Sequence, residues 1–138
     1  MTLIETPDAP PCNGHYSQAV VTGGLVFLSN QLPLVPGSPG LMPEGLEAQV
    51  RQVIANCEVI LRAAGSGLDR VISASVQVTD MAGWPVVDML WAEAFGLHRP
   101  ARGVTAVVAL HLDALVAVQM TAAIQLCNRE DRDDRLYE

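Results

Sequence analysis

The sequence predicts a single α+β domain, a ββαβαββ sandwich in which two helices lie on one face of a mixed β-sheet. Three observations support this fold class. The 138 residues suit one domain with a sizeable core. Two segments have apolar residues at helical spacing. Before, between and after them lie segments in which apolar and polar residues alternate, as in strands. Half of the residues are apolar and only 17% are charged, which is typical of a well-packed body.

The first two strands are expected to form a hairpin. Residues 1–14 are rich in proline and polar groups, and we expect them to be extended. The segments SQAVVT (17–22) and LVFLSN (25–30) both favour strands, and the Gly-Gly pair at 23–24 between them is typical of a tight hairpin turn. The stretch 32–43 that follows is rich in proline and glycine and is expected to be a loop.

The first helix is expected over residues 44–64, where the apolar residues change to helical spacing. They form one stripe, made of Leu46, Val50, Val53, Ile54, Cys57, Ile60, Leu61 and Ala64. On the other side, Glu47/Arg51 and Glu58/Arg62 place an acid four residues before an arginine, which adds a small stabilisation to a helix. The glycine after this segment is expected to end the helix.

The remaining elements are predicted in the same way. Residues 71–80 alternate cleanly and indicate a strand. Its apolar face is expected to carry Ile72, Ala74, Val76 and Val78. A second helix is expected over 84–97, with a proline that is acceptable in its first turn. Two more strands are expected at about 103–109 and 115–126.

One face of the predicted sheet has no helix to cover it. The strand at 71–80 carries small polar groups on its second face, and the last two strands are expected to be apolar on both faces. A monomer would leave this face in water. We therefore expect copies of the chain to associate through it.

Composition and charge exclude several classes of function. The net charge is −7, and the eight cations are all arginines. Without a basic stripe, nucleic-acid binding is disfavoured, and without lysine there is no Schiff-base chemistry. No apolar run is long enough to span a membrane, so no membrane partner is expected. The start of the chain lacks the pattern of a secretory signal.

The residues that most often bind metals are scattered. Three cysteines without a CxxC pair give no zinc site or disulfide framework, which favours a cytoplasmic location. The histidines at positions 15, 98 and 111 show no metal-ligand spacing. We therefore expect neither a metal nor a cofactor.

Four segments in this order resemble the Rid family, the reactive intermediate deaminases, also called the YjgF family. They are NGHYSQAV (13–20), LVFLSNQLPL (25–34), the long segment 49–81 that ends in VTDM, and AEAFGLHRPARGVTAV (92–107). The resemblance covers about residues 10–126. It implies a chorismate-mutase-like fold and a homotrimer with a central barrel, with sites in the clefts between subunits.

The resemblance also sets the expected domain limits and activity. Residues 1–127 would form one Rid-like domain, and the charged tail 128–138 is expected to fray. Deaminating members of the family hydrolyse enamines and imines such as 2-aminoacrylate and 2-iminopropionate to the 2-oxo acid and ammonia. If this chain is an enzyme, we expect such a hydrolase, acting on a small carboxylate-bearing imine.

Arg102 is the main candidate for the site, because it stands at the start of an apolar strand. It matches the carboxylate-binding arginine of the Rid family, and its planar fork suits a bidentate clamp. The residues alone leave its partner open. A carboxylate of the protein, from Asp88, Glu93 or a neighbouring subunit, would make Arg102 structural, whereas a ligand carboxylate would make it a binding residue.

Two positions of the hairpin match the family's pocket. Tyr16 matches the tyrosine that closes the pocket and is a candidate catalytic residue, although it could simply cap the hairpin core. Ser29 matches the serine of the family's SGQ stretch, and Asn30 stands where glycine is usual. We also place Val104, on the strand that Arg102 begins, among the substrate-binding residues.

Two further positions depart from the family pattern. Asp88 stands on the second helix where asparagine is usual, and it either pairs with Arg102, lines the cleft or takes over the acid/base work. Deaminating members usually carry a glutamate fifteen residues after the arginine, but here that position is Ala117. Alanine cannot move a proton or orient a water. Gln119, on the same strand face, can hold a water but is not a base.

This loss leaves two other functions open. The chain could be a non-catalytic small-molecule binder or chaperone-like trimer that kept the Rid scaffold. The ribonuclease activity attached to some family names is disfavoured by the acidic body and the absence of lysine.

Overall fold

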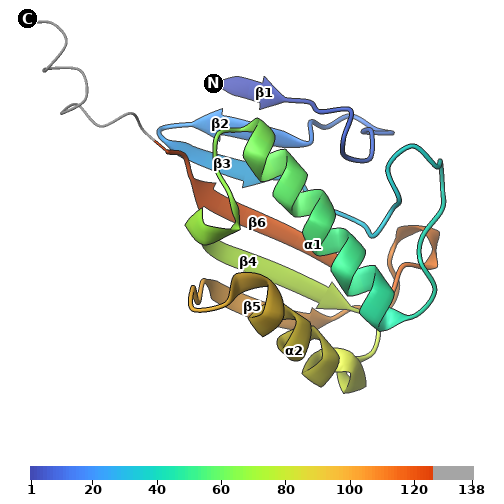
Figure 1. Ribbon diagram of the computed structural model, residues 1–138. Coiled ribbons are helices and arrows are strands. Elements are labelled where there is room, and N and C mark those ends of the chain that lie inside the picture. The colour runs from blue at the N-terminus through green and yellow to red at the C-terminus, as the bar shows by residue number, and fades with distance from the viewer. Residues whose placement is uncertain (126–138) are drawn as a thin grey trace, which may run out of the picture.

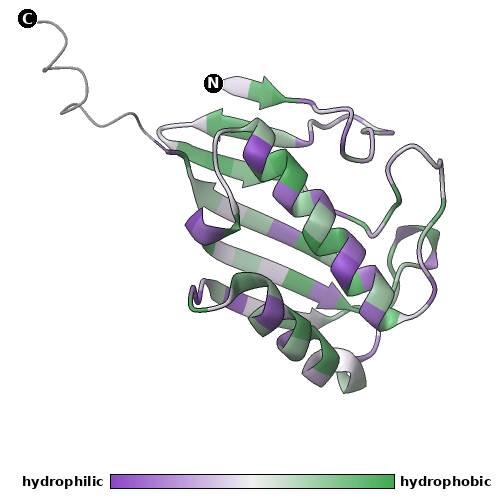
Figure 2. Cartoon of the chain, viewed as in Figure 1, coloured by the Kyte–Doolittle hydropathy of each residue, from purple (hydrophilic) through white to green (hydrophobic). Residues whose placement is uncertain are grey.

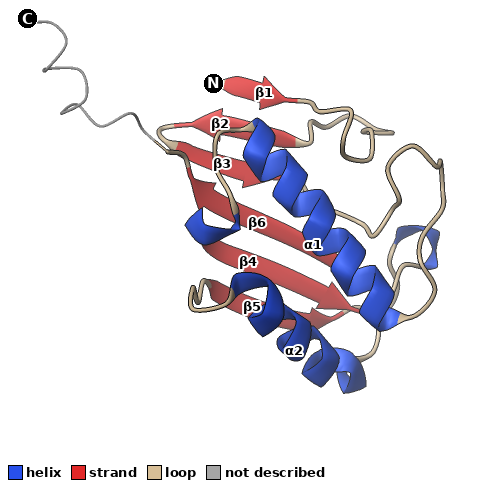
Figure 3. Ribbon diagram, viewed as in Figure 1, coloured by secondary structure: helices blue, strands red, loops and turns tan. Residues whose placement is uncertain are grey.

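A computed structural model describes residues 1–125 and shows a six-stranded mixed sheet with both helices packed on the same face (Figures 1 and 3). The strands are β1 (Thr2–Ile4), β2 (Ala19–Thr22), β3 (Leu25–Leu28), β4 (Val71–Val78), β5 (Ala101–Ala106) and β6 (Val116–Ala123), and the helices are α1 (Leu46–Ala63) and α2 (Trp84–Phe95). The predicted α+β class and ββαβαββ order are confirmed, with one strand added at the start. The tail 128–138 lies outside the described residues.

The additional strand is β1, which pairs antiparallel with β2 at one edge of the sheet. Only three residues long, it is too short to show the alternation that identified the other strands. The sheet order is β1-β2-β3-β6-β4-β5, and β4 and β5 are the parallel pair. Arg102 therefore lies on an edge strand.

The hairpin and the first helix end as predicted. Gly23 and Gly24 have φ of +58° and +78°, which gives the primed turn that joins β2 to β3. Gly65, with φ of +82°, ends α1, and the amides of Gly65 and Ser66 donate to the carbonyls of Arg62 and Leu61 at 3.0 and 2.8 Å. The helix is thus closed by a Schellman motif.

The core lies between the helices and the sheet. Val53, Cys57 and Ile60 of α1 are fully buried, as are Val76 of β4 and Val118 of β6. Figure 2 shows hydrophobic residues along the sheet centre and hydrophilic residues on the outward side of α1. Both predicted acid–arginine pairs of α1 form. None of the helices in the described part of the chain is long and apolar enough to cross a membrane.

The start of β4 differs from the prediction. Ile72 was expected on the buried face, but Val71 is buried and Ile72 is 49% exposed. The pairing register between β4 and β6 shifts between Val71 and Ser73, and an irregularity of this kind reverses the faces of the residues before it. From Ala74 onward the predicted alternation is confirmed.

The second half of the chain has shorter elements than predicted. Helix α2 stops at Phe95, because Gly96 has a positive φ of +62°. Strand β5 is shifted toward the N-terminus because its parallel register with β4 begins at Ala101. The segment 107–115 is a loop in which Leu112 and Asp113 adopt left-handed backbone conformations.

The sheet face opposite the helices is more polar than predicted. The register places Ser75 and Gln77 of β4 together with Gln119 and Thr121 of β6 on this face. The expectation that the last strands are apolar on both faces was therefore wrong for β6. Phe27 of β3, opposite Thr121, is an exposed large apolar residue of this face, and Leu3 of β1 is another.

Candidate functional site

Arg102 faces the helix side of the sheet. Its register partner on β4 is Ala74, a core residue, so its side chain points toward α2. Nη1 donates a hydrogen bond of 2.9 Å to Oδ1 of Asp88. The guanidinium carbon lies 5.8 Å from the centre of the Trp91 ring, within the range of a cation–π contact. The side chain remains 20% exposed.

Asp88 is the protein carboxylate that pairs with Arg102. Glu93, the other candidate on α2, bonds instead to both terminal nitrogens of Arg51, at 3.2 and 3.3 Å. The Asp88 side chain is 52% exposed. Within residues 1–125, its second oxygen has no hydrogen-bond partner, and neither do Nε and Nη2 of Arg102. The pair is therefore only half satisfied by the protein.

A pocket of about 480 Å³ opens beside this pair, between the end of α2 and the start of β5. Its lining consists of Asp88, Trp91, Ala92, Phe95, Gly96, His98, Arg99, Pro100 and Arg102. Two guanidinium groups and one carboxylate leave one excess positive charge. His98 Nε2 lies 2.7 Å from the carbonyl of Val71, and because a carbonyl only accepts, this nitrogen carries the proton. The arrangement suits an anionic group on a small ligand.

Trp91 adds an unpartnered donor to the wall of this pocket. The residue is 5% exposed, and its indole N–H is buried without an acceptor among the described residues. Trp91, His98 and Arg99 were not among the site residues predicted from the sequence. The available signal for Trp91 was its spacing from Asp88: the two residues are three apart on a helix and therefore lie on the same side of it.

A second polar cluster lies on the uncovered face of the sheet. Asn30 Nδ2 donates to Oε1 of Gln77 at 3.0 Å. Because β6 lies between β3 and β4, this bond crosses β6. Ala117, the register partner of Gln77, is fully buried there. Sequence reasoning missed Gln77, since only the register of β4 and β6 reveals it.

The other predicted site residues have local contacts of their own. Ser29 Oγ donates to the carbonyl of Ser17 at 2.6 Å and braces the hairpin end. Tyr16 is 54% exposed, with its ring close to Gly14. Val104 packs against the core. Gln119 lies half-buried on the uncovered face, and its Nε2 donates to the carbonyl of Met120 at 3.3 Å.

The predicted residues thus form two groups on opposite faces of the sheet. Arg102, Asp88 and Val104 lie on the helix side, whereas Asn30 and Gln119 lie on the uncovered side. A single copy of the chain does not bring the two groups into one site.

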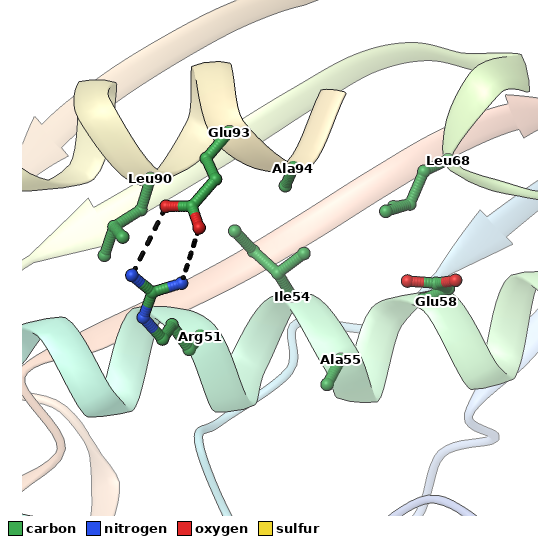
Figure 4. A pocket seen from close by; sticks show the side chains of 8 residues that line it. All are labelled: Arg51, Ile54, Ala55, Glu58, Leu68, Leu90, Glu93 and Ala94. Atoms are coloured by element: carbon green, nitrogen blue, oxygen red, sulfur yellow. Dashed lines mark hydrogen bonds and ion pairs between the residues drawn. The ribbon is translucent and has the colours of Figure 1, made fainter. Parts of the chain in front are cut away.

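Another hollow lies between α1 and α2 and has a volume of about 310 Å³. Figure 4 shows Arg51 directed at Glu93 across it, with Ile54 and Leu90 beside the pair. The two charges neutralise each other, and their bonds raise the pKa of Arg51. This hollow is explained by the packing of the two helices.

The fold and the pocket define a small α+β protein with a positively charged pocket at a sheet edge. Residues 6–124 match the family model described as Endoribonuclease L-PSP, and the chain belongs to this family, the Rid (YjgF) proteins. The resemblance seen in the sequence is confirmed.

Three known proteins illustrate the relationship. The chain is 34% identical to Reactive Intermediate Deaminase A, chloroplastic, of Arabidopsis thaliana over 88% of its own length and 65% of that protein. It is 32% identical to the 2-iminobutanoate/2-iminopropanoate deaminase of Bos taurus, covering 87% and 88% of the two chains. The crystal structure of RidA from the Antarctic bacterium Psychrobacter sp. superposes with a TM-score of 0.87 at 33% identity, covering 90% of this chain and all of that one.

Proposed function

We propose that the protein is an imine deaminase that hydrolyses a small carboxylate-bearing imine or enamine to the 2-oxo acid and ammonia. The observation that carries this proposal is the half-satisfied guanidinium of Arg102 at the wall of an open pocket. Nε and Nη2 are left to bind a ligand carboxylate side by side. The bovine relative, named a 2-iminobutanoate/2-iminopropanoate deaminase, supports this substrate class.

The proposed reaction needs no cofactor. Once the imine nitrogen is protonated, its carbon is electrophilic, and water adds to it while the C=N electrons move to nitrogen. The oxygen loses its protons, the nitrogen gains one, and cleavage of the C–N bond releases ammonia and leaves the 2-oxo acid. Arg102 fixes the carboxylate, so that the neighbouring carbon is held for attack.

The group that moves protons differs from the family pattern. Ala117 cannot serve, and Gln119 is not a base. Asp88 is the carboxylate that lines the pocket, so it is the residue we assign to the acid/base work: it holds the protonated nitrogen and, once water has added, relays a proton from the oxygen to that nitrogen. A general base typically accelerates a reaction by about 10²–10⁴, so removing the Asp88 carboxylate should lower the rate of imine hydrolysis by a factor of this order.

The complete site is proposed to need a second copy of the chain. Tyr16, Ser29, Asn30 and Gln119 would line the cleft from a neighbouring subunit, packed through the uncovered sheet face. The trimer number comes from the family resemblance. A cytoplasmic location is part of the proposal, on the cysteine usage given above.

The test is the loss of an imine generated in the assay. An amino-acid oxidase acting on alanine supplies 2-iminopropanoate, and its decay is followed with wild type, Arg102→Ala, and Arg70→Ala as a control arginine outside the pocket. Wild type and Arg70→Ala should accelerate the decay, and Arg102→Ala should lose most of that acceleration. Equal rates for wild type and buffer would refute deamination of this substrate.

Ala117 also supports the second candidate, a non-catalytic binder. It is fully buried where the family's deaminating members carry a glutamate. A wild-type protein that binds pyruvate, weakly or tightly, but leaves imine decay at the buffer rate would establish this alternative.

A further inference from the structure

We propose that Asp88 makes the pocket selective for zwitterionic ligands, which place a carboxylate on Arg102 and a protonated nitrogen on Asp88. The inference rests on the proposed function, because the protonated form of a 2-imino acid is such a zwitterion. It narrows the substrate class to the iminium form, against the enamine and the 2-oxo acid product.

Within residues 1–125, the geometry leaves positions unfilled on both partners, namely one oxygen of Asp88 and the Nε and Nη2 nitrogens of Arg102. The bond between Arg102 Nη1 and Asp88 Oδ1, at 2.9 Å, uses one nitrogen and one oxygen. Asp88 lines the pocket, and its remaining oxygen has no partner within the described residues. A nitrogen and a carboxylate on adjacent carbons of one ligand can therefore reach both residues at once.

The charges in the pocket favour the same ligand. A ligand that carries only a carboxylate would bring its negative charge close to the carboxylate of Asp88, because both would bind the same guanidinium. A cation next to the ligand carboxylate removes this repulsion and gives Asp88 an opposite charge. Arg99, which also lines the pocket, keeps the pocket positive overall.

A structural role for the pair would look different. A salt bridge that only joins α2 to β5 has no need of a carboxylate that leaves one oxygen without a protein partner in the described part of the chain. The Arg51–Glu93 pair shows how this same helix makes such a link, with both guanidinium nitrogens and both carboxylate oxygens in use. Figure 4 shows that second arrangement.

The experiment is calorimetric titration with three unreactive ligands of one skeleton. L-Alanine carries the carboxylate and the ammonium, L-lactate replaces the ammonium with a hydroxyl, and pyruvate replaces it with a carbonyl. The variants are Asp88→Asn, which removes the charge and keeps the shape, and Glu93→Gln, which removes the same charge elsewhere on α2.

Wild type and Glu93→Gln should bind alanine more tightly than lactate and pyruvate. Asp88→Asn should lose roughly three- to fivefold in alanine affinity and gain a similar factor for the two anions, as for a partly exposed charge pair. The ratio of affinities then inverts or approaches one. The same variants are run in the imine-decay assay.

Three results would each overturn the inference. The wild type could bind lactate and pyruvate as tightly as alanine, Asp88→Asn could change the affinity for all three ligands equally, or no ligand could bind measurably. The imine-decay assay distinguishes a failure of the proposed selectivity from a failure of the proposed deamination. Imine decay accelerated without a preference for alanine rejects the selectivity alone, whereas a preference without acceleration rejects deamination alone.

Discussion

Asn30 and Gln77 are hydrogen-bonded across β6 at 3.0 Å, and fully buried Ala117 is the register partner of Gln77. The small side chain of Ala117 leaves room for the hydrogen-bonded side chains of Asn30 and Gln77 on this face. An amide bridge and a larger residue at position 117 would compete for the same space. We therefore expect the two departures from the family pattern, at 30 and at 117, to be energetically coupled.

Ala117→Glu alone should therefore lower the free energy of unfolding by about 2 kcal/mol, within the range for overpacking a filled site. Asn30→Gly removes the bridge, and adding it to Ala117→Glu should recover at least half of that loss. Urea unfolding of the wild type, both single variants and the double variant gives the coupling. Additive effects of the two substitutions would show that the positions are independent.

Phe27→Asp should weaken association of the chain. Phe27 is 40% exposed on the uncovered face, opposite Thr121, so an interface through this face would bury a charge. Light scattering coupled to size exclusion should show a smaller species for Phe27→Asp than for wild type. Leu41→Asp, which changes an exposed loop residue in the same way, is the control and should keep the wild-type mass. A wild-type monomer would contradict the proposed assembly.

Cys57 should resist alkylation in the folded protein, whereas Cys12 should react slowly. Burial raises the pKa of both thiols, strongly for Cys57, and the charge of Glu5 adds to the rise for Cys12. A raised pKa lowers the thiolate fraction at pH 8, and the thiolate is the reactive form. Peptide-level mass spectrometry after iodoacetamide treatment, with and without urea, measures each site. Labelling of Cys57 before unfolding would contradict its burial.

Local patterns were enough to predict most of the fold. The helical stripe of α1, the Gly-Gly turn and the alternation from Ala74 onward depend on neighbours in the sequence, and all three are confirmed. The reversal at Ile72 and the short strand β1 depend on pairing with distant strands, which periodicity does not contain. Strand register depends on two paired strands, so it could not be predicted from the periodicity of one segment.

The candidate site divides along the same line. Arg102 and Asp88 were identified from a motif and a departure from it, and the structure shows which carboxylate Arg102 holds. Glu93 is excluded as the partner of Arg102 because it bonds to Arg51 on the other helix, a contact that the sequence could not specify. Likewise, the separation of Gln119 from Arg102 follows from the strand register, since paired residues share a face.

All residues that line the pocket beside Arg102 come from one continuous piece of chain, between positions 88 and 102. This piece runs from the second turn of α2 into the edge strand and leaves β6, at the centre of the sheet, untouched. The share of the site that one subunit contributes is consequently a single stretch of fifteen residues, so exchanging this stretch between relatives, with its core residues Leu90, Trp91 and Phe95, would isolate its effect on ligand preference.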